Sequence, residues 1–121
     1  MATERSQEFR KKLIEFAIKL IRLTKILPKT PENLIIFNQA IRSSTSIGAN
    51  YAEAIFALTR ADFTHCLNIC KKETAETLHW LEILLQLNPR FSKEIEIVAN
   101  ETESYLRIFI SSVKTAQKNN I

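Results

Sequence analysis

The chain has 121 residues, of which 45% are hydrophobic, so it has the length of one domain and too much apolar content for an intrinsically disordered protein. One Gly and three Pro provide few turn residues for a many-stranded sheet, and the apolar runs are far shorter than the roughly 20 residues of a transmembrane helix. We expect one cytoplasmic domain, residues 1–121, without membrane association and with its two cysteines reduced.

The first predicted helix covers about residues 3–27. Its apolar residues recur at steps of three and four, which places them on one helical face: Phe9, Leu13, Phe16, Leu20, Leu23 and Leu27. Residues 1–29 hold eight of the 17 basic residues and three acidic ones, a net charge of +5 in a chain whose total is +4. Attraction to polyanions should therefore centre on this helix.

The second predicted helix covers about residues 31–58, with Thr30 as N-cap and Pro31 as first helical residue. The residues of its predicted core face are apolar at both ends and small in the middle: Leu34, Phe37, Ile41, Ser44, Gly48, Tyr51, Ile55 and Leu58. A close approach of another helix is expected at that middle section.

Two further helices are predicted over residues 60–87 and 92–118. Thr59 and Asp62 have the spacing of a capping box at the start of the third helix, and Ser92 is the expected cap of the fourth. Four long amphipathic helices joined by short connections favour an all-α, up-down-up-down antiparallel four-helix bundle.

The segment "RSSTSIGANYAEA" is unusual for the middle of a helix, because Ser, Thr, Asn and Gly are poor helix formers. Small side chains would let a neighbouring helix approach closely at Ser44, Gly48, Ala49 and Ala52. Polar groups that lose water there need partners, namely Arg42, Asn50 and Glu53. We interpret the segment as an interface, inside the bundle or between subunits; the alternative is a solvated face, which usually favours Lys, Glu and Gln.

Two carboxylates interrupt an otherwise apolar face of the third helix, at Glu73 and Glu76. In an antiparallel hairpin that turns near Arg60, Arg42 falls near Glu76 and Ser46 falls near Glu73. The sequence therefore predicts a charge-assisted contact between Arg42 and Glu76.

The same residues resemble a known family. "RSSTSIGANYAEA", followed by "ADFTHCLNICKKETAETLHWLEIL", is similar to the bacterial four-helix-bundle proteins encoded in intervening sequences of large-subunit ribosomal RNA genes, a family that includes the accessory variability determinant proteins of diversity-generating retroelements. The family signature falls on Arg42, Ser43, Ser46, Ile47, Asn50, Glu53, Phe63, Glu73 and Glu76. Ala54 departs from it, since many members have Gly there.

The resemblance implies a homo-oligomer, typically a ring of five, with no known enzymatic activity and no cofactor. It also implies nucleic acid and a reverse transcriptase as partners of the retroelement relatives, which bind them through basic surfaces.

A metal-dependent enzyme is the alternative from another class, because four-helix bundles can hold two metal ions on Glu-x-x-His motifs from two helices. Glu76 and His79 match that motif once, and Asp62 with His65 matches it loosely. The two histidines are separated by roughly 21 Å along one helix, so they do not share an ion within a subunit. We therefore predict no metal site and no catalytic residue.

Nucleic-acid binding is expected on the first helix through Arg5, Lys12, Lys19, Arg22 and Lys25, of which the first three repeat at heptad spacing. A solvated basic face is the simpler explanation of these residues. The leading hypothesis is a noncatalytic, homo-oligomeric scaffold or adaptor that contacts RNA or DNA through this helix. A purely protein–protein assembly module is the third hypothesis.

Overall fold

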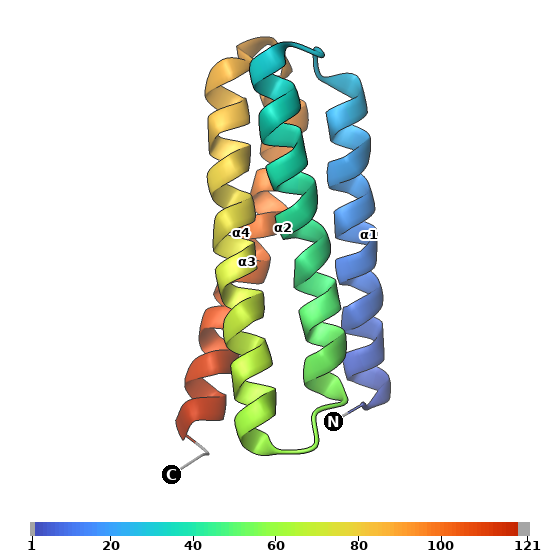
Figure 1. Ribbon diagram of the computed structural model, residues 1–121, viewed down its shortest axis with the longest axis vertical. Helices are drawn as coiled ribbons and strands as arrows, with labels where there is room; N and C mark the ends of the chain where they lie inside the picture. The colour runs from blue at the N-terminus through green and yellow to red at the C-terminus, as the bar shows by residue number, and fades with distance from the viewer. Residues whose placement is uncertain (1, 119–121) are drawn as a thin grey trace.

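The computed structural model describes residues 2–118, so residues 1 and 119–121 of the predicted domain lie outside the described part. The helices alternate in direction along the chain (Figure 1): α1 (Glu4–Ile26), α2 (Pro31–Ile55), α3 (Arg60–Leu87), the short 3₁₀ helix η1 (Pro89–Phe91) and α4 (Ser92–Lys118). No strand occurs within the described residues. The predicted all-α, up-down-up-down four-helix bundle is confirmed.

Side-chain caps explain where the first three helices begin. The Thr30 hydroxyl accepts a hydrogen bond from the backbone N–H of Asn33 at 3.2 Å, and Thr59 accepts one from Asp62 at 3.1 Å. Each bond satisfies one of the N–H groups that have no partner inside a helix. Both predicted caps are thus confirmed; Thr3 caps α1 in the same way, in a capping box with Ser6 that the sequence analysis missed.

Two helix boundaries differ from the expected ones. The second helix ends at Ile55 rather than near residue 58, because the Ala57 N–H bonds to the carbonyl of Ala54 at 3.1 Å and tightens the chain into a turn. Leu58 lies in this turn and is 97% exposed, so it is not part of the core. Ser92 is itself helical and follows η1 directly, so it is not the predicted N-cap of α4.

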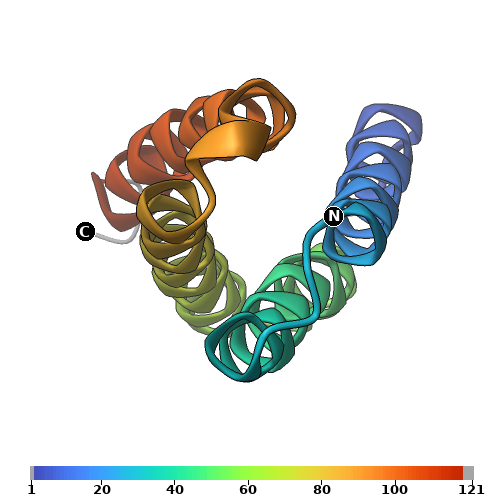
Figure 2. The ribbon, with the colours of Figure 1, turned by 90° about the horizontal axis from the view of Figure 1, so that it is seen from above.

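The core lies between the inward faces of the four helices, which form an arc with α1 and α4 at its two ends (Figure 2). Aromatic rings fill the space between these two end helices. The Phe9 ring lies 5.8 Å from that of Tyr105 and 5.9 Å from that of Phe109, and the Phe16 ring lies 5.4 Å from that of Tyr105. Edge-to-face contacts between large side chains therefore connect α1 to α4, and the Phe9–Tyr51 ring pair, at 5.0 Å, connects α1 to α2 in the same way.

Candidate functional site

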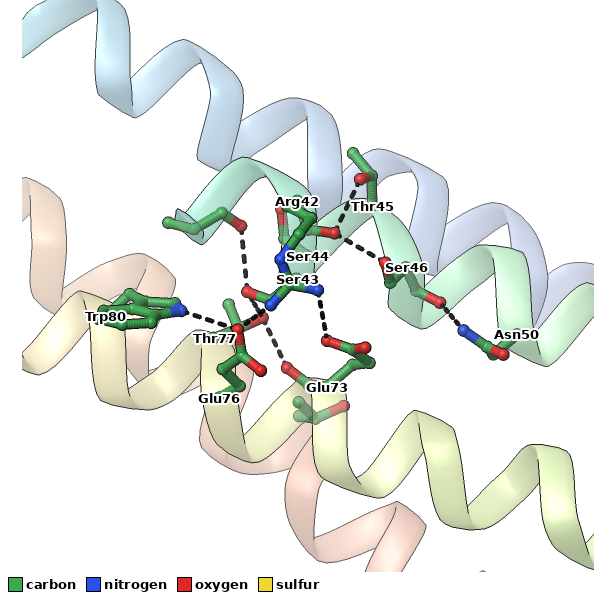
Figure 3. Close-up of polar contacts among 12 residues, drawn as sticks. Arg42, Ser43, Ser44, Thr45, Ser46, Asn50, Glu73, Glu76, Thr77 and Trp80 are labelled. Carbon is green, nitrogen blue, oxygen red and sulfur yellow. Dashed lines mark hydrogen bonds and ion pairs between the residues drawn. The ribbon is translucent and has the colours of Figure 1, made fainter. Parts of the chain in front are cut away.

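The residues of the sequence signature lie on α2 and α3, and one group of them lies where these two helices meet. There the guanidinium of Arg42 contacts both carboxylates: Nη1 lies 3.4 Å from Oε1 of Glu73, and Nη2 contacts Oε2 of Glu76 (Figure 3). The indole N–H of Trp80 donates to the same Glu76 oxygen at 3.1 Å. The predicted Arg42–Glu76 contact is confirmed, and Arg42 bridges two carboxylates one helical turn apart.

This polar cluster, formed by Arg42, Glu73, Glu76 and Trp80, lies at the edge of the α2–α3 contact and is open to water on one side. The Arg42 side chain is 48% exposed. Its ion pairs are therefore screened, and each contributes modestly to stability. Ser46 was expected near Glu73, but it does not join the cluster. Its hydroxyl instead donates to the Arg42 carbonyl of its own helix at 2.8 Å.

Most of the other polar members of the signature also form hydrogen bonds, either within α2 or across to α3. Ser43 is fully buried, and its hydroxyl lies 2.8 Å from that of Thr77 on α3. The Asn50 amide donates to the Ser46 carbonyl at 2.8 Å. Glu53 is exposed and forms no ion pair with the described residues. The buried hydroxyls thus obtain partners without bringing a charge into the core.

The small residues of α2 do not all serve one contact. Ser44 is fully buried, and Gly48 faces α1, where a Cβ at position 48 would lie 3.6 Å from the Cβ of Leu13. Thr45 and Ala49 are instead exposed on the outside of the molecule. The predicted close helix approach therefore accounts for part of the small-residue run, and no other helix of the described residues covers its outward part.

The five basic residues proposed for nucleic-acid binding are all exposed on α1. Lys19 forms an ion pair with Glu101 of α4, at 3.0 Å. The other four form no ion pair with the described residues: Arg5, Lys12, Arg22 and Lys25. Arg5 and Lys12 also line a groove of about 900 Å³ between α1 and α4, together with the rings of Phe9 and Tyr51.

The thiols lie outside the polar cluster, whereas the His79 ring lies 4.9 Å from that of Trp80, at the edge of the cluster. Cys70 is buried, its thiol donates to the Ile47 carbonyl at 3.5 Å, and burial raises its pKa to about 12, so it stays protonated at neutral pH. Burial also raises the pKa of Cys66, which is half-buried. His65 and His79 are exposed. Across residues 2–118 no three His, Cys, Asp or Glu side chains gather as a metal site would require.

One buried polar contact was missed by the sequence analysis. Asn33 at the start of α2 and Asn88 at the end of α3 exchange side-chain hydrogen bonds of 2.7 and 3.0 Å, and both residues are buried. The amides also donate to the carbonyls of Pro28 and Leu84. The Asn-Pro pair at positions 88 and 89 is a turn signal in the sequence. No local pattern indicates that Asn88 pairs with Asn33, 55 residues earlier.

The fold and these surfaces define a small all-α bundle whose distinctive polar residues serve helix packing. None of the described helices is long and apolar enough to cross a membrane. A family model described as 23S rRNA-intervening sequence protein matches residues 5–111, and the chain belongs to this family.

A solved structure agrees with that assignment. The crystal structure of a protein of unknown function from the S23 ribosomal protein family of Bacteroides thetaiotaomicron is 36% identical in sequence, with a TM-score of 0.79. The match covers 90% of this chain and 97% of that one. No curated protein matches the chain. Neither the family description nor that of the solved structure specifies an enzymatic activity.

Proposed function

We propose that the protein is a noncatalytic, cytoplasmic, self-assembling scaffold that contacts RNA or DNA through the basic surface of α1, defined by Arg5, Lys12, Arg22 and Lys25. The observation that supports nucleic-acid contact is the absence of ion pairs from these four exposed side chains within the described structure. A cation without a protein partner is free to neutralise a phosphate and release a counterion. Lys19 is left out because Glu101 already neutralises it.

Self-assembly multiplies this surface. A ring of five copies, as the family resemblance implies, would present the four cations five times along a phosphate backbone. Each added phosphate contact steepens the dependence of affinity on salt. Contacts of this kind carry no base readout, so we expect weak sequence preference.

The test is a titration of single- and double-stranded RNA and DNA at increasing salt, with the oligomer verified beforehand by mass. A quadruple variant with Gln at Arg5, Lys12, Arg22 and Lys25 should lose most binding and reduce the salt slope by about 1 for each phosphate contact removed. The matched control also replaces two Arg and two Lys by Gln, at exposed positions elsewhere: Arg90, Lys93, Arg107 and Lys114.

The control variant should bind as the wild type does, because its total charge changes equally but its α1 surface is intact. Equal loss in both variants would mean that net charge alone attracts the polymer. No binding by an intact wild-type oligomer at low salt would remove the nucleic-acid part of the proposal.

A protein partner completes the adaptor role. The resemblance to accessory variability determinant proteins favours a polymerase such as a reverse transcriptase, with its own nucleic acid bound. Recovery of such a polymerase with the tagged protein from its native host, before and after nuclease treatment, separates a direct protein contact from one mediated by nucleic acid.

A further inference from the structure

A stripe of uncharged residues runs along the outer side of α2, bordered by the exposed side chains of Arg42 and Glu53. Residues at helical spacing on this face are apolar, small or neutral: Leu34, Asn38, Thr45, Ala49, Ala52 and Phe56. Charged residues make up 25% of the chain and normally dominate a face that only water covers. This face therefore has the composition of a contact surface, and most of its residues are exposed in the described structure.

The face continues into a groove of about 290 Å³ between α1 and α2. Ile14 and Ile18 of α1 form one wall and are 42% and 41% exposed. Thr45, Ala49 and Ala52 form the other wall, and their short side chains leave the groove open. These isoleucines expose apolar surface to water. Burying that surface against a partner would be energetically favourable.

One charged side chain lines the groove, and it is basic. Arg10 lines it, and no acidic residue does. Lys11 lies two helical turns before Ile18, on the exposed side of the same helix, and the nearest exposed carboxylates are those of Glu15 and Glu53. Two copies that met groove to groove would bring these cations together, which disfavours a symmetric contact. The partner surface should instead be apolar with an acidic border.

The first half of α4 presents such a surface on the same chain. Ile97 is 65% exposed, and the residues on its stripe of the helix continue as Glu101, Ser104 and Ile108. Glu94, one turn before Ile97, is exposed and forms no ion pair with the described residues. We call this surface, from Glu94 to Ile108, the α4 stripe. Its isoleucines match the apolar groove, and the Glu94 carboxylate matches the cations Arg10 and Lys11 beside the groove.

We propose that the α1–α2 groove of one copy binds the α4 stripe of a second copy. This inference rests on the self-assembly in the proposed function and specifies the two surfaces that meet. Because the two surfaces differ, each copy has one of each, and the contact repeats head to tail. Repetition of this kind closes into a ring when the rotation between copies permits.

Two substitutions test the two surfaces separately. Ala49→Glu fills the groove and places a carboxylate against the acidic stripe, and Ile97→Glu removes the apolar side chain that the groove receives. Both positions are exposed, so each variant should keep its helix content by circular dichroism. Ala75→Glu is the matched control, since Ala75 is an exposed alanine in the middle of α3.

Solution masses by light scattering give the result. We expect the wild type and Ala75→Glu to share one oligomeric mass, and each of the other variants alone to fall to the 14.0 kDa protomer. Mixing Ala49→Glu with Ile97→Glu should restore one intact interface, between the stripe of the first and the groove of the second. The mixture should therefore form a 1:1 dimer of twice the protomer mass and grow no further.

Each other outcome has a distinct meaning. A monomeric wild type overturns the self-assembly of the proposed function. If Ala49→Glu remains oligomeric, the α1–α2 groove is not a subunit contact surface. A third outcome is that Ala49→Glu is monomeric, Ile97→Glu stays oligomeric and their mixture forms no dimer. That result would mean that the groove binds a surface other than the α4 stripe, and it would overturn the head-to-tail pairing.

Discussion

Asn33 and Asn88 form a reciprocal pair of side-chain hydrogen bonds, 2.7 and 3.0 Å long, that joins the start of α2 to the end of α3 in the interior of the bundle. Each amide also donates to a backbone carbonyl near a helix end, at Pro28 and Leu84. The pair therefore satisfies the polar ends of two helices that water does not reach.

Asn88→Ala should lower the free energy of unfolding by about 1–3 kcal/mol, because the Asn33 carbonyl oxygen stays buried without its donor. Asn33→Ala should have a comparable effect, and the double variant should cost less than the sum of the two. Urea unfolding at one fixed protein concentration measures all three. Asn100→Ala, at an exposed position of α4, is the control and should change stability little. Strict additivity would show that the two amides are not energetically coupled.

Gly48→Ala should raise the free energy of unfolding by about 0.5–1 kcal/mol. The new Cβ would lie 3.6 Å from the Cβ of Leu13, an ordinary contact distance, and Ala has the higher helix propensity. Thermal and urea unfolding measure the change. The reverse substitution at an exposed helix site, Ala75→Gly, should lower stability by a similar amount. A loss of stability in Gly48→Ala would mean that α1 and α2 tolerate no added methyl group there.

Arg42→Ala should lower the free energy of unfolding by only about 0.5–1 kcal/mol, because the guanidinium is half exposed and its ion pairs are screened. The loss should shrink in 1 M salt, where the repulsion that Arg42 relieves between Glu73 and Glu76 is also screened. Arg107→Ala removes an exposed arginine without an ion pair among the described residues and serves as control. An Arg42→Ala effect that is independent of salt would contradict the electrostatic role.

Stability should fall at alkaline pH because of Cys70. Burial holds the pKa of its thiol near 12, above the ordinary value of 9.0, so unfolding releases a proton once the pH exceeds about 9. The contribution is fully present below pH 9 and is lost as the pH rises towards 12, with a slope of up to about 1.4 kcal/mol per pH unit. Urea unfolding between pH 7 and 11 measures it.

Cys70→Ser should have a flatter alkaline decline than the wild type, whatever its stability at neutral pH. Cys66→Ser is the matched control one turn away; its thiol is half-buried, so its removal should change the slope less. Burial also raises the pKa values of Tyr51 and Tyr105, but those groups are the same in all three proteins. Equal slopes for the wild type and Cys70→Ser would contradict the assignment to Cys70.

Apolar periodicity and side-chain caps are local signals, so the amino-acid pattern alone predicts the four helices, their order and most of their boundaries. It also determined the Arg42–Glu76 contact, since an antiparallel hairpin fixes which turns of α2 and α3 lie opposite each other. It failed at Ser92 and at the end of α2, where the chain tightens into turns whose geometry depends on the neighbouring helices.

The division of the small α2 residues among neighbouring helices depends on how the bundle packs. Periodicity places Ser43, Gly48 and Ala49 on different sides of one helix, but it does not say which sides other helices cover. The packed bundle shows Ser43 against α3, Gly48 against α1 and Ala49 facing outward. The Asn33–Asn88 pair likewise required the fold, because burial and partnership between distant residues arise from packing and have no local pattern.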